Sequence, residues 1–135
     1  MDKKNVLIVD DNPTIASIVR EALRSEGYGV TCVYSGEEAL DYLEGQTVDL
    51  IILDVLMPQM DGFEVLRRVK VSPKTVSTPV IMLTVNDKHD DVLKAYRLGA
   101  ECYITKPFRP RELIHNVQRV LGKAADGAAK PATES

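Results

Sequence analysis

The sequence is poor in cysteine, in basic blocks and in long apolar runs, and each shortage excludes a class of protein. Its two cysteines, Cys32 and Cys102, stand far apart without CxxC or CxxH spacing, so we expect reduced thiols rather than metal ligands. Lys and Arg total 17 against 20 Asp and Glu, a balance that predicts no direct nucleic acid binding. No stretch resembles a signal peptide or could span a bilayer, so we expect a cytoplasmic protein without membrane contact.

Short apolar segments alternate with amphipathic ones along the chain. Three of the apolar segments are nearly continuous runs, as in strands that helices cover on both faces. Between them, apolar residues recur at helical spacing, for example at Ile15, Ile18 and Val19. The predicted strands are 5–10, 29–34, 48–55, 79–84 and 102–105. The alternation predicts an α/β protein of the (βα)5 type, with a doubly wound, parallel five-stranded sheet.

Residues typical of helix ends separate these segments. Asn12 offers an N-cap before Pro13, and the stretches 35–38 and 61–64 have the spacing of capping boxes. Four helices are expected to end at glycines, namely Gly27, Gly45, Gly99 and Gly122. The last stretch is small, polar and without a core-forming pattern. We therefore expect one domain over residues 1–122, followed at 123–135 by a flexible, Ala-rich tail or linker remnant.

Polar side chains follow four of the five predicted strands. The first strand ends in Asp10 and Asp11, the third in Asp54 and the fourth in Thr84, and Lys106 follows the fifth. Ligands of open α/β sheets bind at the carboxyl ends of the strands, so these groups should meet at one edge.

Clustered carboxylates are costly unless a cation or protons neutralise them. Oxygen ligands suit Mg²⁺ here better than a calcium cage. For Asp10 and Asp11 alone, a solvated loop that caps a helix is an equal alternative. With Asp54, Thr84 and Lys106 at the same edge, the pattern favours a metal site suited to phosphoryl chemistry, with Asp54 as nucleophile.

In these residues the chain resembles the receiver domain of bacterial two-component response regulators, from residue 4 to about residue 122. The matching motifs are the Asp10-Asp11 pair, Asp54 within LIILDVLMPQMDG, Thr84, and Lys106 within KPF. The resemblance implies a flavodoxin-like fold with the strand order 2-1-3-4-5.

The resemblance also implies a role for each carboxylate. Asp54 would be the phosphoacceptor. Asp10, Asp11 and Asp54 would coordinate Mg²⁺, with Mn²⁺ as an alternative, and the backbone carbonyl of Leu56 would be a further metal ligand.

Three further residues would complete the site in the same way. Thr84 would hydrogen-bond the phosphoryl group and Lys106 would form an ion pair with it, so that both act with the acceptor in catalysis. Tyr103 matches the aromatic switch residue that rotates inward when Thr84 moves.

The function that the resemblance implies is a phosphorylation-dependent signalling switch and not a turnover enzyme. A sensor histidine kinase or a phosphotransfer protein would donate the phosphoryl group. The chain would catalyse its own phosphorylation and slow dephosphorylation. The fourth helix, fifth strand and fifth helix would then present a changed surface to a downstream effector protein or a fused output domain. We expect a monomer that can dimerise when phosphorylated.

Two apolar residues beside the predicted acceptor bear on its kinetics. Val85 follows Thr84 where this family usually has a small residue, and Leu56 cannot position a hydrolytic water. We expect altered rates and a long-lived phosphoryl state.

Three other functions are weighed against the switch. A flavodoxin-like cofactor binder would need a phosphate cradle after the first strand, where this chain has DDNP. A Mg²⁺-dependent phosphatase would be expected to carry its nucleophile on the first strand in a DxD arrangement. A degenerate receiver that only binds proteins is disfavoured because all five polar residues of the expected site are present.

Overall fold

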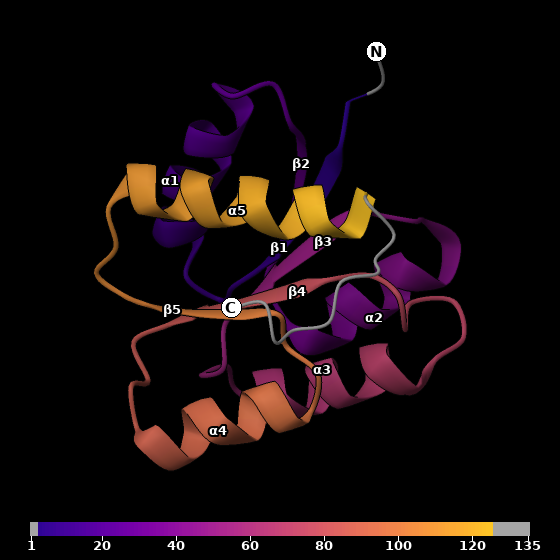
Figure 1. The fold of residues 1–135 in the computed structure, drawn as a ribbon. Helices are drawn as coiled ribbons and strands as arrows, with labels where there is room; N and C mark the ends of the chain where they lie inside the picture. The colour runs from indigo at the N-terminus through magenta and orange to yellow at the C-terminus, as the bar shows by residue number, and fades with distance from the viewer. Residues whose placement is uncertain (1–2, 126–135) are drawn as a thin grey trace.

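Strands and helices alternate strictly in the structure, a computed structural model that describes residues 3–125 (Figure 1). The strands are β1 (Asn5–Val9), β2 (Gly29–Val33), β3 (Leu50–Leu53), β4 (Val80–Thr84) and β5 (Cys102–Thr105). The helices are α1 (Pro13–Arg24), α2 (Gly36–Gly45), α3 (Gly62–Val71), α4 (His89–Arg97) and α5 (Pro110–Ala125). Every predicted strand is confirmed within its predicted range.

The five strands form one parallel sheet in the order β2-β1-β3-β4-β5, as expected for a flavodoxin-like fold. In the register of the sheet, Val9 at the end of β1 lies beside Leu53 at the end of β3. Thr84 at the end of β4 likewise lies beside Thr105 at the end of β5. Because these ends are aligned, the residues that follow them emerge at the same edge of the sheet.

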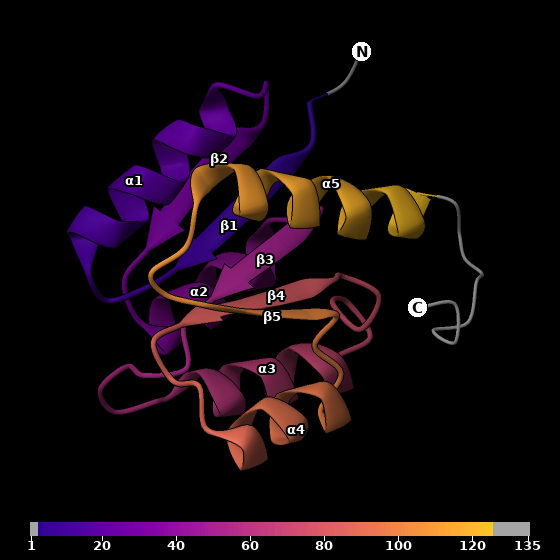
Figure 2. The same ribbon diagram turned by 60° about the vertical axis from the view of Figure 1, so that its left-hand side comes forward.

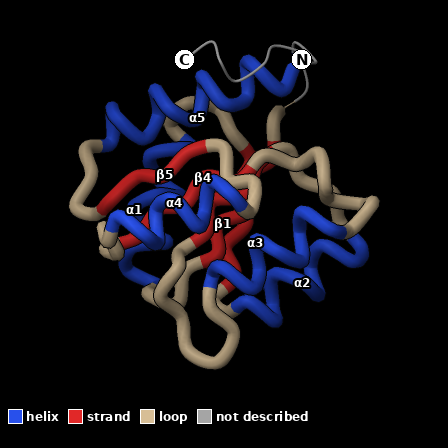
Figure 3. The backbone as a smooth tube through the Cα atoms, turned by 60° about the horizontal axis from the view of Figure 1, so that its bottom comes forward, coloured by secondary structure: helices blue, strands red, loops and turns tan. Residues whose placement is uncertain are grey.

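Helices cover both faces of the sheet, as Figure 2 shows, with α1 and α5 on one face and α2, α3 and α4 on the other. Alternate residues of β1 supply the two cores. Val6 and Ile8 pack with residues of α1 and α5, whereas Leu7 and Val9 pack with residues of α2, α3 and α4. On the latter face α2 and α3 lie side by side (Figure 3). The near-continuous apolar runs in the sequence follow from this burial on both faces.

The predicted helix starts are confirmed by their capping bonds. The side chain of Asn12 accepts hydrogen bonds from the N–H groups of Thr14 and Ile15, at 3.0 and 3.3 Å. Ser35 and Asp61 cap α2 and α3 in the same way. Each of these three helices therefore begins directly after its predicted cap residue, with its first turn on the side of the carboxyl edge of the sheet.

The predicted helix ends are confirmed except for the last one. Gly27 and Gly99 have φ of 93° and 109°, in the left-handed region that glycine adopts without strain. The expected end of the fifth helix at Gly122 is wrong, because α5 continues to Ala125. One glycine inside a helix costs only about 1 kcal/mol, and the Lys and Ala residues that follow it are good helix formers. The rest of the expected tail, 126–135, lies outside the described residues.

None of the helices within residues 3–125 has both the length and the apolar character needed to cross a bilayer.

Candidate functional site

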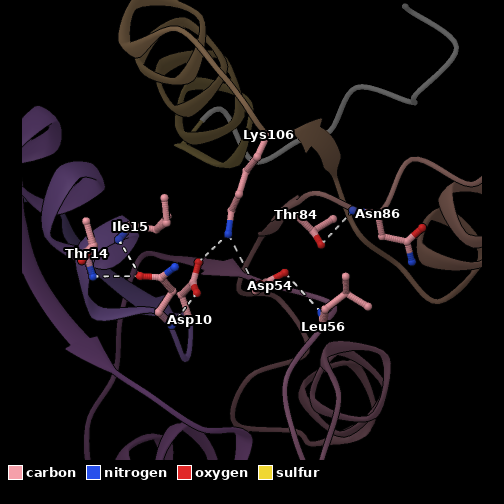
Figure 4. A network of polar contacts seen from close by, with 9 residues as sticks. Asp10, Thr14, Ile15, Asp54, Leu56, Thr84, Asn86 and Lys106 are labelled. Carbon is pink, nitrogen blue, oxygen red and sulfur yellow. Dashed lines mark hydrogen bonds and ion pairs between the residues drawn. The ribbon is translucent and has the colours of Figure 1, made fainter.

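Four side chains from four strand ends meet at the carboxyl edge of the sheet (Figure 4). Asp10 follows β1, Asp54 follows β3, Thr84 ends β4, and Lys106 follows β5. The Lys106 ammonium points between two of the carboxylates (Figure 4), with its Nζ 2.8 Å from Asp10 Oδ2 and 3.4 Å from Asp54 Oδ2. The Lys106–Pro107 peptide bond that follows β5 is cis. The prediction that Asp10, Asp54 and Lys106 lie together is confirmed, and Thr84 ends its strand at the same edge.

This ion cluster is almost removed from solvent. The side chains of Lys106, Asp10 and Asp54 are 10%, 5% and 8% exposed. Burial raises the pKa of the Asp10 carboxyl above its ordinary value, and the nearby charge of Asp54 adds to the rise. The Lys106 ammonium and the backbone N–H of Asn12, which donates to Asp10 Oδ1 at 2.9 Å, oppose that rise. At Asp10, the ammonium and the N–H of Asn12 therefore only partly offset the cost of burial.

A third carboxylate gives the cluster the composition of a divalent cation site. One oxygen each from Asp10, Asp11 and Asp54 lie within 4.8 Å of one another, and Asp11 is exposed. Three carboxylates against one ammonium leave an excess of negative charge at a partly buried place. Hard oxygen donors with this excess charge fit Mg²⁺, which keeps several waters and is held by few carboxylates.

The acceptor candidate, Asp54, is positioned by hydrogen bonds to the backbone of neighbouring residues. Its N–H donates to the carbonyl of Val9 at 3.0 Å, and its Oδ1 accepts from the N–H of Leu56 at 3.2 Å. On the other side, a Cβ at Gly62 would collide with the backbone carbonyl of Asp54, so only glycine permits the first turn of α3 to pack there. In the sequence, Gly62 appears in a capping box and as the last residue of the motif LIILDVLMPQMDG, but neither pattern indicated this close approach to Asp54.

Thr84 is fully buried at the end of β4, and its Oγ1 accepts a hydrogen bond from the N–H of Asn86 at 3.3 Å. Two exposed apolar side chains stand beside the polar centre. Val85 is 59% exposed and Leu56 is 50% exposed. The site is thus a buried polar centre with apolar residues at its solvent side.

Tyr103, the predicted switch residue, reaches the loop that follows β4. Its hydroxyl donates a hydrogen bond to the backbone carbonyl of Asn86 at 2.6 Å. Burial raises the pKa of Tyr103 to about 12, and the carboxylates of Asp91, Asp54 and Asp87 contribute to the rise. The phenol is therefore neutral and lies within the field of the Asp54 carboxylate. Sequence reasoning missed Asn86, which contacts both Thr84 and Tyr103.

The sequence model of the family described as "Response regulator receiver domain" matches residues 6–118. The chain is also similar to several solved structures.

One is the chemotaxis protein CheY4 of Vibrio cholerae, with 35% identity over 88% of this chain and 99% of that chain, and a TM-score of 0.84. A second is the signal receiver domain of a signal transduction histidine kinase from Syntrophus aciditrophicus, with 37% identity over 95% and 97% of the two chains and a TM-score of 0.85. A third is the receiver domain of the sensor histidine kinase PA1611 from Pseudomonas aeruginosa, whose structure has a magnesium ion coordinated in the active site cleft. That similarity covers 90% of this chain and 99% of the other, with 33% identity and a TM-score of 0.82.

Proposed function

Since the chain belongs to the response regulator receiver domain family, whose members are phosphoacceptors of two-component systems, we propose that it is a phosphorylation-dependent switch with Asp54 as acceptor. The observation that carries this proposal is the shared ammonium. The Lys106 Nζ lies 3.4 Å from the Asp54 carboxylate. Both groups lie at the carboxyl edge of the sheet, where Asp54 also meets Asp10 and Asp11. A neighbour of known structure that coordinates magnesium in its active site cleft supports the same arrangement.

The phosphoryl transfer would use the chain's own residues in three roles. A carboxylate oxygen of Asp54 forms the new bond to phosphorus while the bond between phosphorus and the donor breaks. The Lys106 ammonium, already beside Asp54, pairs with a phosphoryl oxygen. The Thr84 hydroxyl donates a hydrogen bond to another oxygen. These fixed groups lower the barrier because they are in place before the charge is redistributed.

Asp10, Asp11 and Asp54 would hold a Mg²⁺ ion, with Mn²⁺ as an alternative and the backbone carbonyl of Leu56 as a further ligand. When bound there, the divalent ion supplies positive charge that offsets the charge of the phosphoryl oxygens.

The signal would leave the site through Thr84 and Tyr103. Phosphorylation adds about 1.5 to 2 negative charges and new acceptor oxygens next to Thr84. As Thr84 turns toward them, Tyr103 follows, and the surface formed by α4, β5 and α5 changes. A sensor histidine kinase or phosphotransfer protein is the proposed donor, in keeping with similarity to receiver domains of histidine kinases. The changed surface would act on an effector protein or an output domain, and the chain would be a monomer able to dimerise when phosphorylated.

Intact-mass measurement after incubation with a small phosphodonor and Mg²⁺ tests the proposal. We expect a gain of one phosphoryl group that requires the divalent ion and is lost in Asp54→Asn. Asp61→Asn is the matched control, because Asn caps the α3 terminus as well as Asp does. A gain that persists in Asp54→Asn would assign another acceptor. The absence of any gain in the wild type would favour a degenerate, protein-binding receiver.

A further inference from the structure

Asn86, in the loop between β4 and α4, makes hydrogen bonds through both its backbone and its side chain. Its backbone N–H donates to Thr84 Oγ1 at 3.3 Å, and its backbone carbonyl accepts from the Tyr103 hydroxyl at 2.6 Å. Its side-chain Oδ1 accepts from the N–H of Lys88 at 3.1 Å, and its Nδ2 donates to Asp91 Oδ2 at 3.0 Å. One residue therefore contacts the end of β4, the middle of β5 and the first turn of α4.

The start of α4 depends on this side chain. The N-cap residue of α4 is Lys88, and its side chain makes no capping hydrogen bond. Helix N-termini carry unsatisfied N–H groups that need partners from outside the helix. Asn86 supplies an acceptor for one backbone N–H at the helix start and fixes the carboxylate of Asp91 in the first turn. It therefore holds the N-cap residue and the first turn of α4 from two residues before the N-cap position.

The hydrogen bonds of Asn86 divide into two sets. Its backbone atoms face Thr84 and Tyr103, and its side-chain atoms face α4. A substitution of the side chain therefore removes the connection to α4 and leaves the backbone bonds to the site and to β5 available.

We propose that Asn86 is a positioning residue that couples α4 to the hydroxyl of Thr84. When Thr84 turns toward a phosphoryl group on Asp54, the backbone of Asn86 moves with it, and the side chain of Asn86 moves the first turn of α4. The inference rests on the proposed function, since it uses phosphorylation of Asp54 as the event that moves Thr84.

Exchanging the two side chains of the Asn86–Asp91 pair tests the coupling. Asn86→Asp places two carboxylates in contact and removes the donor, while its oxygens still accept from Lys88. Asp91→Asn combined with Asn86→Asp restores one donor and one acceptor in the opposite direction, with the net charge of the wild type. Asp87→Asn, at an exposed position in the same loop, also changes the local charge near Tyr103 by one unit but leaves the Asn86–Asp91 pair intact, so it controls for a change of charge alone.

Hydrogen exchange of the α4 amides is measured before and after phosphorylation, and intact mass records the extent of phosphorylation. We expect all variants to be phosphorylated. The change in α4 exchange upon phosphorylation should fall severalfold in Asn86→Asp, recover in the double variant, and stay at the wild-type level in Asp87→Asn. A merely structural role would shift the melting temperature without altering this response.

Two results would overturn the coupling: a wild-type response in Asn86→Asp, or a double variant that responds no better than Asn86→Asp. If the wild type gains no phosphoryl mass, phosphorylation itself has failed, before any coupling to α4 can be observed. That result would overturn the proposed function itself, and the coupling to phosphorylation with it.

Discussion

Two ion clusters in this structure each join carboxylate and cationic side chains, but they differ in how deeply these side chains are buried. At the carboxyl edge, one ammonium is shared by two carboxylates, and all three side chains are at most 10% exposed. On α3, one carboxylate, that of Glu64, is shared by Arg67 and Arg68, whose side chains are about half exposed. The exposed pairs are the shorter ones, at 2.6 and 2.7 Å, against 2.8 and 3.4 Å in the buried cluster.

The pKa values of the two clusters move in opposite directions. The two arginines lower the pKa of the Glu64 carboxyl to about 2. Burial raises the pKa of Asp10 although it also has a cation beside it. The comparison shows that distance alone does not rank these pairs. Solvent screens the exposed cluster, whereas desolvation makes every charge of the buried one costly and therefore responsive to a cation or a phosphoryl group.

Removing the buried cation should have the largest effect on stability. Lys106→Met leaves two buried carboxylates without their ammonium, so we expect the free energy of unfolding in metal-free buffer to fall by about 3 kcal/mol. Urea denaturation at pH 7 measures this change. Lys74→Met is the control, because the Lys74 ammonium pairs with an exposed Glu44. Equal denaturation midpoints for Lys106→Met and the wild type would contradict the electrostatic account of the site.

Removing one buried carboxylate should instead raise the free energy of unfolding. Asp54→Asn relieves the repulsion with Asp10, so we expect a gain of about 1 kcal/mol in metal-free buffer. Mg²⁺ should then stabilise the wild type more than the variant. At a Mg²⁺ concentration 100 times the dissociation constant of the wild type, the free energy of unfolding of the wild type should rise by about 2.7 kcal/mol. Thermal unfolding across a Mg²⁺ series measures both effects. Equal stabilisation of the two proteins by Mg²⁺ would exclude Asp54 as a ligand.

Opening the buried cluster to water should have a moderate effect on rates. Val85 is exposed beside Thr84, and its removal in Val85→Ala gives donors and water easier access to Asp54. We expect phosphorylation and decay of the phosphoryl state to become severalfold faster. Phosphorylation time courses followed by intact mass provide both rates. Val71→Ala, at the exposed end of α3, is the matched control, and unchanged rates in Val85→Ala would refute the idea.

Breaking the exposed cluster on α3 should have the smallest effect on stability. Glu64→Gln is expected to lower the melting temperature by no more than about 2 °C. Because the folded-state pKa of Glu64 is lowered from 4.5 to about 2, its contribution to stability is present above pH 4.5 and is lost as the pH falls toward 2. An NMR titration of the Glu64 carboxyl checks this, and a midpoint near 4.5 would show that the arginines do not hold it.

Most of the fold could be predicted because local and global signals agree. The apolar runs, caps and glycines each indicated the same alternation of strand and helix. The parallel topology then brought Asp10, Asp54 and Lys106 together, although Lys106 lies 96 residues from Asp10 in sequence. The wrong helix end at Gly122 shows the limit of a local signal, since a glycine ends a helix only when the chain beyond it turns away.

Two residues of the site region could not be predicted from sequence patterns. The importance of Gly62 depends on how closely α3 approaches the backbone of Asp54, which is a tertiary contact. The importance of Asn86 depends on a loop whose path brings Thr84, Tyr103 and Asp91 within hydrogen-bond distance of one residue. Periodicity describes faces of helices and strands, and it contains no information about loop paths.

The parallel sheet also gives the molecule a second edge that is useful for engineering. Every loop that leads from a strand into a helix lies at the edge with Asp54, so every loop that leads from a helix into a strand lies at the opposite edge. Ser77, in the loop between α3 and β4, is exposed there. A cysteine introduced at Ser77 could carry a fluorescent dye or a surface linker, and phosphorylation could then be followed on immobilised protein with the acceptor edge facing free solution.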